Sequence, residues 1–158
     1  MDPDISLIDE TYDTNITSSY FLSIQACLDG FSFATLDPVR NKYIQFKHFQ
    51  FNNIGKDELK SLTENLFEEN ELLNLPYKKV FVLIPSPYST LIPAGLYNSS
   101  EAAAWLSFTH DIPANHAVMN APMKLSDAWN IFSVPSDLKE LFTRQYPDPV
   151  FLHPYIPV

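Results

Sequence analysis

The sequence predicts a mixed α/β domain whose five-stranded sheet begins with an antiparallel meander of three strands and continues with parallel strands. Three observations lead to this prediction. Residues 20–36 contain two strand-like stretches separated by a turn signal. Residues 56–73 have the apolar spacing of a helix, and residues 79–84 are continuously apolar, as in a strand that is buried on both faces.

The length and composition of the chain are typical of a folded domain without a membrane span. The chain has 158 residues, of which 46% are hydrophobic and 14% aromatic, so a core can form without disulfides. The N-terminus, Met1-Asp2-Pro3-Asp4, lacks the positive charge of a signal peptide. No stretch approaches the ~20 apolar residues of a membrane helix. We therefore expect a cytoplasmic protein.

Residues 1–17 are acidic and without periodicity and are predicted to be an extended lead-in. The first structured element after them is expected to be a hairpin. Asp29-Gly30 is predicted as a type I′ turn, in which both central positions need positive φ. This turn pairs Ala26 with Phe33. The apolar side chains of both strands then share one buried face of the sheet: Tyr20, Leu22, Ile24, Ala26, Leu28, Phe31, Phe33 and Thr35.

The third strand of the meander is predicted at residues 43–51, after a turn at residues 37–41. Ile44 and Phe46 are expected beside the buried residues of the preceding strand, Thr35 and Phe33.

A helix must cover the apolar face of this meander, and residues 56–73 supply it. Its apolar stripe consists of Leu59, Leu62, Leu66, Phe67 and Leu73. The strand at residues 79–84 is expected to pair parallel to the first strand, with the helix as the crossover connection.

The second half of the chain is richer in proline, because ten of the 13 prolines lie at or beyond Pro85. Short helices are predicted at residues 100–108 and 135–146, and strands at 116–121, 128–134 and 150–152. The helix at 100–108 is expected to begin at Ser99 or Ser100 as its cap. Because Pro113 and Pro122 suit sheet edges, residues 116–134 are expected to form a separate hairpin. Trp105 and Trp129 are expected to anchor the core of this half.

Several local stretches carry a family resemblance: Ser23-Ile24-Gln25, Leu28-Asp29-Gly30-Phe31-Ser32-Phe33, Asn41-Lys42-Tyr43, Tyr77-Lys78-Lys79-Val80, Leu91-Ile92-Pro93, Phe108 to His110 and Val134-Pro135. They resemble a bacterial family, domain-of-unknown-function family 3822, whose members look like two actin-like lobes in tandem without an assigned activity. The order of the elements matches one lobe of the ribonuclease H-like or actin-like ATPase fold. The resemblance implies one lobe at residues 18–153 and the start of a linker to a missing second lobe at 154–158.

The charge of the chain argues against binding to nucleic acid or to an anionic membrane. Ten Lys and Arg residues face 19 Asp and Glu residues, which gives a net charge of -9. Eleven of the acids lie in residues 1–13 and 57–71. These two acidic segments are typical of solvated surfaces, with a partner-binding acidic surface as the alternative.

The sequence does not carry a phosphate-binding motif. The three glycines, Gly30, Gly55 and Gly95, are isolated, so neither a Walker loop nor a dinucleotide fingerprint can be placed. Actin-like ATPases resemble one another in an Asp-x-Gly-Thr/Ser turn, whereas this chain has Asp29-Gly30-Phe31-Ser32. The departure falls on the positions that the resemblance implies for phosphate contacts.

Other catalytic patterns are also weak. A ribonuclease H-like site needs converging carboxylates, and Asp29 with Glu58 or Glu64 lacks a partner on the strand that ends at Ile84. His110-Asp111 with His116 could hold a metal, but their spacing favours a turn and a strand start. The remaining candidates are expected to be structural: Cys27, His48, Ser86, Ser89, Thr90 and His153. We predict no catalytic, cofactor-binding or metal-binding residues.

The function expected from the sequence is therefore a non-catalytic protein-interaction or scaffold domain, an actin-like lobe without an intact phosphate loop. The expected partner is another protein, the chain's own second lobe or a second copy, bound at apolar surface around residues 85–97 or at the C-terminal tail. The alternative is a nucleotide-binding, ATPase-like protein whose site needs the second lobe. Whether the protein is an enzyme stays open, with the sequence leaning against it.

Overall fold

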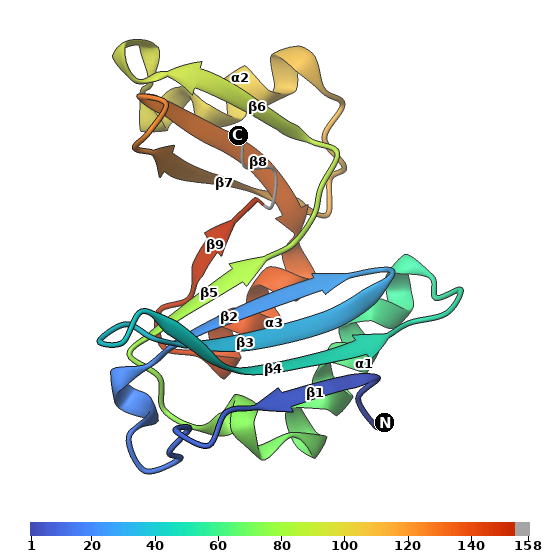
Figure 1. Cartoon of the computed structure of the whole chain (residues 1–158). Coiled ribbons are helices and arrows are strands. Elements are labelled where there is room, and N and C mark those ends of the chain that lie inside the picture. The colour runs from blue at the N-terminus through green and yellow to red at the C-terminus, as the bar shows by residue number, and fades with distance from the viewer. Residues whose placement is uncertain (154–158) are drawn as a thin grey trace. The chain divides into compact units, whose positions relative to one another are not determined.

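The computed structural model describes residues 1–153, which divide into two compact units (Figure 1). Unit 1 consists of residues 1–83 and 141–150, and unit 2 of residues 84–140 together with the end of the described chain. The linker predicted at residues 154–158 lies outside the described residues. Within the described part, no helix has the length and apolar character needed to cross a membrane.

The larger sheet is mixed and has six strands in the order β1-β4-β3-β2-β5-β9. Its strands are β1 (Ile5–Ile8), β2 (Phe21–Cys27), β3 (Gly30–Asp37), β4 (Lys42–Gln50), β5 (Lys79–Leu83) and β9 (Val150–Leu152). The predicted meander is confirmed as β2, β3 and β4, and β5 runs parallel to β2. The additional strand is β1, which lies in the segment predicted as a lead-in and pairs antiparallel with β4.

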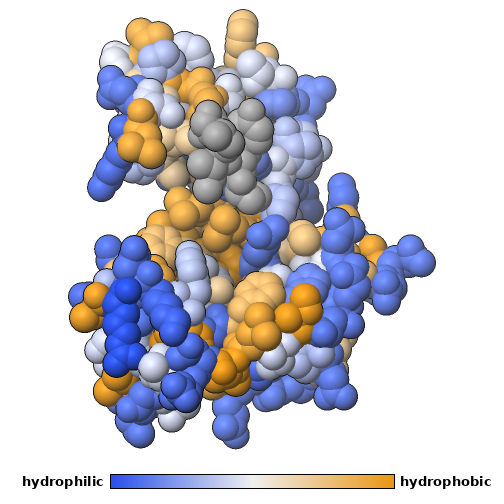
Figure 2. All heavy atoms as spheres, viewed as in Figure 1, coloured by the Kyte–Doolittle hydropathy of each residue, from blue (hydrophilic) through white to orange (hydrophobic). Residues whose placement is uncertain are grey.

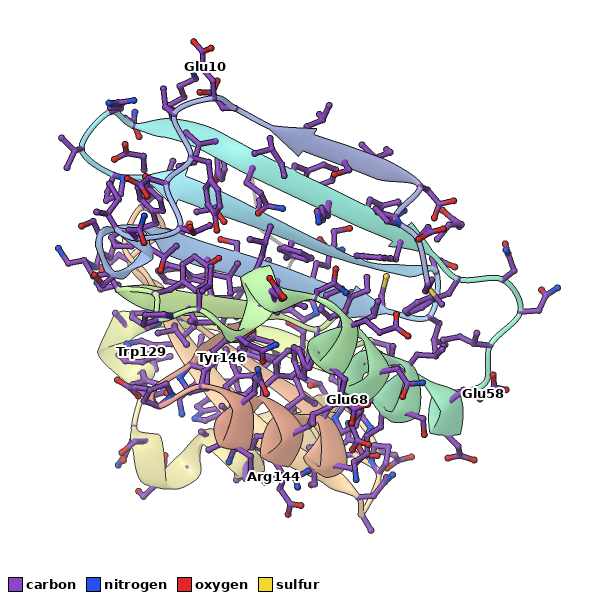
Figure 3. All side chains as sticks on the ribbon, turned by 90° about the horizontal axis from the view of Figure 1, so that it is seen from below. Glu10, Glu58, Glu68, Trp129, Arg144 and Tyr146 are labelled. Carbon is purple, nitrogen blue, oxygen red and sulfur yellow. The ribbon has the colours of Figure 1, made fainter. Side chains whose placement is uncertain are left out.

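Helix α1 (Lys56–Glu69) connects β4 to β5, and a short 3-10 turn (Glu71–Asn74) follows it. Its buried side chains are Leu59, Thr63, Leu66 and Phe67. Helix α3 (Ser136–Gln145) continues into Tyr146, whose hydroxyl donates a hydrogen bond to the Leu73 carbonyl at 2.9 Å. Figure 3 shows Glu58 and Glu68 on α1 and Arg144 on α3, with both helices on one side of the sheet. The helical cover that the sequence predicts is therefore present.

The turn between β2 and β3 differs from the prediction. Ala26 pairs with Phe31, not Phe33, and Cys27 pairs with Gly30, so the turn residues are Leu28 and Asp29. None of these turn residues has positive φ, so the predicted type I′ turn is wrong. Because the register error is two residues, the buried face is the predicted one, except that Leu28 is exposed.

The predicted register of β4 is wrong for a different reason. A β-bulge between Thr35 and Leu36 places Thr35 opposite Gln45 and shifts the alternation of β4. Phe46 therefore lies opposite Ala34 on the other face of the sheet, and Gln45 takes a buried position.

Unit 2 is built on a separate three-stranded antiparallel sheet in the order β6-β8-β7. Its elements are β6 (Ser89–Pro93), α2 (Ala102–Thr109), β7 (His116–Met123) and β8 (Ala128–Pro135), with short 3-10 turns at Ala94–Leu96 and Ser99–Glu101. The prediction that residues 116–134 form a hairpin outside the main sheet is confirmed, and β6 joins that hairpin.

The core of unit 2 forms where α2 packs on its sheet. Ala102 and Leu106 of α2 are buried with Ile92 and Ile131. Trp129 stacks on Tyr97 at a ring-centroid distance of 4.0 Å, but Trp105 is 37% exposed. The prediction that both tryptophans anchor this core is therefore wrong for Trp105, and Ala102 and Leu106 take the buried positions of α2 instead.

Candidate functional site

The residues at the predicted phosphate position make contacts within the sheet. The Ser32 hydroxyl lies 2.7 Å from His48 Nδ1 on the neighbouring strand. The Phe31 ring is fully buried and packs against Phe33, Phe49 and Phe67. This arrangement pairs two strands and fills the core, and it gives the Ser32 hydroxyl a protein partner.

The histidines predicted near a turn surround a tyrosine. The Tyr88 ring lies edge-on to His110 and to His116, at centroid distances of 6.0 and 5.5 Å. His110 Nε2 donates to the Ser89 carbonyl at 3.2 Å, and His116 Nδ1 lies 2.9 Å from the Ser133 hydroxyl. His153 Nε2 donates in the same way to the Ser86 carbonyl, at 2.7 Å. Across residues 1–153, no three His, Cys, Asp or Glu side chains are grouped so that they could hold a metal ion.

A cluster of polar side chains lies at one end of the larger sheet. The Tyr12 and Tyr77 hydroxyls are 2.9 Å apart, and Tyr77 donates to the Leu72 carbonyl at 2.7 Å. Burial raises the pKa of the Tyr77 hydroxyl, so it stays protonated at neutral pH and remains a donor. Thr35 donates to Gln45 Oε1 at 2.9 Å. The cluster thus ties the segments before β2 and β5 to the sheet, which is a structural role.

The strongest candidate site is an apolar surface on α2 that we call the α2 patch: Glu101, Ala104, Trp105 and Phe108. These residues follow the spacing i, i+3, i+4 and i+7, which places them on one side of a helix. They line a shallow hollow of about 340 Å³. Phe108 is 87% exposed. Ala102 and Leu106 are buried on the side of α2 that packs on the sheet, whereas Ala104, Trp105 and Phe108 are exposed.

Local sequence explains why the helix presents this surface. The Asn98 side chain accepts hydrogen bonds from the Ser100 backbone N–H and hydroxyl, at 3.1 and 2.8 Å. Asn98 is therefore the capping residue, not Ser99 or Ser100 as predicted, because the helix begins with a 3-10 turn. The three alanines that follow have high helix propensity and little bulk, so neighbouring aromatic residues stay accessible.

The chemistry of the α2 patch suits apolar binding. Tryptophan and other aromatic residues often dominate the energy of protein interfaces. Glu101 is the charged member of the patch. The apolar surface predicted around residues 85–97 is present in part, since Leu91 and Leu96 are 41% and 61% exposed. The α2 patch was not predicted from the sequence. The lack of a continuous polar side on residues 102–108 could have indicated that some apolar residues of this helix are exposed.

Comparisons with known proteins agree with the predicted fold. The family model described as "Protein of unknown function (DUF3822)" matches residues 9–158. A solved structure from Bacteroides thetaiotaomicron VPI-5482, described as a protein with actin-like ATPase fold and unknown function, superimposes with a TM-score of 0.82 at 26% identity. The match covers 90% of this chain and 55% of that chain. No curated protein matches the chain. The actin-like fold predicted from the sequence is thus confirmed.

Proposed function

Because the chain belongs to the DUF3822 family of proteins of unknown function, we propose that it is a non-catalytic interaction lobe that binds a partner helix through the α2 patch. The observation that carries the proposal is the 87% exposure of Phe108 beside Trp105, on a helix whose sheet-facing side is already buried. The partner is an amphipathic helix that lays an apolar stripe on Trp105 and Phe108 and places a Lys or Arg opposite Glu101.

The physical argument combines burial and charge. Burying an exposed aromatic side chain contributes about 1.5–3 kcal/mol, so Phe108 alone supports a measurable interaction. The net charge of -9 and the carboxylate of Glu101 favour a partner with a basic rim. An apolar face at helical spacing that docks on a second helix is a common mode of recognition.

A first prediction concerns the apolar anchor. A synthetic amphipathic peptide with leucines at i, i+3, i+4 and i+7 and lysines beside them is expected to bind the chain in isothermal titration calorimetry. Phe108→Ser is expected to weaken binding at least tenfold, because about 1.4 kcal/mol of lost apolar contact corresponds to a factor of ten. Leu125→Ser is the matched control: Leu125 is another exposed apolar side chain, but it lies on the turn between β7 and β8.

Three outcomes bear against the proposal: no binding to the unmodified chain, the same loss with Leu125→Ser, or full binding by Phe108→Ser. A peptide in which glutamates replace the lysines tests the charge argument separately. We expect this acidic peptide to bind more weakly to the unmodified chain and to recover affinity with Glu101→Lys.

The second candidate function is nucleotide binding by a two-lobed form of the protein. It is favoured by the Bacteroides protein, which is described as having an actin-like ATPase fold. This chain covers 55% of that longer chain. The burial of Phe31 in the core speaks against it, because the residue beside the Ser32 hydroxyl fills the interior and offers no open cradle for phosphate.

A thermal-shift assay on a chain that carries both lobes separates the two functions. We expect the melting temperature to stay unchanged at millimolar ATP with Mg²⁺. A ligand present at 100 times its Kd stabilises the native state by about 2.7 kcal/mol, so binding would be visible. A rise that depends on both ATP and Mg²⁺ would contradict the non-catalytic proposal for the whole protein.

A further inference from the structure

We propose a second docking site, independent of the α2 patch: the free edge of β1 accepts an extended partner segment in which apolar residues alternate and Lys or Arg residues flank them. The segment would extend the larger sheet as an additional strand, a mode of recognition in which backbone hydrogen bonds supply much of the affinity.

The first observation is the position of β1 in the sheet. β1 is the terminal strand of the order, and among the described residues only β4 pairs with it (Figure 1). Leu7 lies opposite Phe46, and the Asp9 backbone N–H donates to the Ile44 carbonyl at 2.8 Å. Because hydrogen bonding alternates along an antiparallel strand, the backbone groups of Leu7 point towards β4. Those of Ser6 and Ile8 therefore point to the open edge, where a new strand could bind them.

The second observation is the apolar character of this edge. Ile5, Leu7 and Ile8 are 45%, 63% and 56% exposed. Natural edge strands are usually protected by lysine, proline or a bulge, and the sequence Ile5-Ser6-Leu7-Ile8 contains no lysine or proline. In the view of Figure 2, hydrophobic residues interrupt the hydrophilic surface where β1 and β4 lie. The edge therefore offers both unpaired backbone groups and apolar contacts.

The third observation identifies the occupant by its charge. Residues 1–13 contain five acids and no Lys or Arg, and Asp4 and Asp9 directly flank β1. Asp9 already forms an ion pair with Lys42 at 2.8 Å, so the carboxylates near this edge without an ion pair among the described residues are Asp2, Asp4 and Glu10. A second copy paired antiparallel at this edge, with Ser6 of one chain opposite Ile8 of the other, would bring Asp4 of one chain close to Glu10 of the other. Like charges at a strand pair are destabilising, so a partner with basic flanks is favoured over a second copy.

The test uses a fluorescent peptide with three valines that alternate with threonines between pairs of lysines, and it measures fluorescence anisotropy with the full chain. The unmodified chain is expected to bind this peptide. Ser6→Pro removes one outward N–H and is expected to weaken binding at least tenfold, because proline is tolerated at an edge but cannot donate. Ser6→Thr keeps the N–H and is expected to bind as the unmodified chain does.

Two further measurements separate the remaining outcomes. Asp2→Asn with Glu10→Gln changes only exposed carboxylates, and it is expected to weaken binding several-fold at low salt and less at high salt. Analytical ultracentrifugation of the unmodified chain alone is expected to show no dimer that forms through β1. The proposal is overturned if the peptide does not bind, if Ser6→Pro binds normally, or if the chain forms a dimer that Ser6→Pro dissociates.

Discussion

Replacing Phe67 with alanine is expected to lower the free energy of unfolding by about 3–5 kcal/mol, the range observed when a buried phenylalanine is truncated. Phe67 is 5% exposed and lies on α1. Its ring lies edge-on to Phe31 of β3, to Phe142 of α3 and to Tyr146, with centroid distances of 6.3, 5.5 and 6.0 Å. One side chain therefore joins both helices of unit 1 to the sheet, and its removal leaves a cavity that three rings line.

Urea unfolding followed by circular dichroism measures this loss. Phe108→Ala is the matched control, because the same atoms are removed from a helix at a position that is 87% exposed. Surface substitutions usually change stability by less than about 0.5 kcal/mol. Equal midpoints for the two variants would show that Phe67 does not hold the helices on the sheet.

Much of the fold could be predicted because side-chain alternation reveals which face of a strand is buried. Ile24 and Phe33 lie on the same buried face even though their predicted partners were wrong, since a register error of two residues preserves the face. The bulge at Thr35 could not be predicted, because it depends on how β3 pairs with β4 and not on a local pattern. β1 has four residues, too few for a recognisable alternation.

The α2 patch shows a different limit. The sequence predicts a core position for Trp105 because large aromatic residues are usually buried, but α2 has no continuous polar side that would mark its outer face. Contacts with Ile92 and Ile131, which are distant in the sequence, determine that Ala102 and Leu106 face inwards. Which aromatic residues remain available to a partner is thus a property of the tertiary structure.

Gly30→Ala is the second large expected effect, with a loss of about 1–3 kcal/mol in the free energy of unfolding. A Cβ atom at this position would lie 2.6 Å from the Phe49 carbonyl oxygen and 2.9 Å from His48 Cε1. The first of these atoms belongs to the backbone of β4 and cannot move without disturbing the strand pairing. Gly95→Ala is the control, because no atom lies within 4 Å of the added Cβ. It is expected to be neutral or slightly stabilising.

Asparagine at position 30 distinguishes the two explanations for this glycine. If glycine were needed for positive φ, as in the type I′ turn predicted from the sequence, Gly30→Asn would be milder than Gly30→Ala, because asparagine tolerates the left-handed region. The backbone of Gly30 does not have positive φ, and the close neighbour is a carbonyl oxygen. Gly30→Asn is therefore expected to be at least as destabilising as Gly30→Ala in urea unfolding. The reverse order would mean that the turn, and not the approach of β4, requires the glycine.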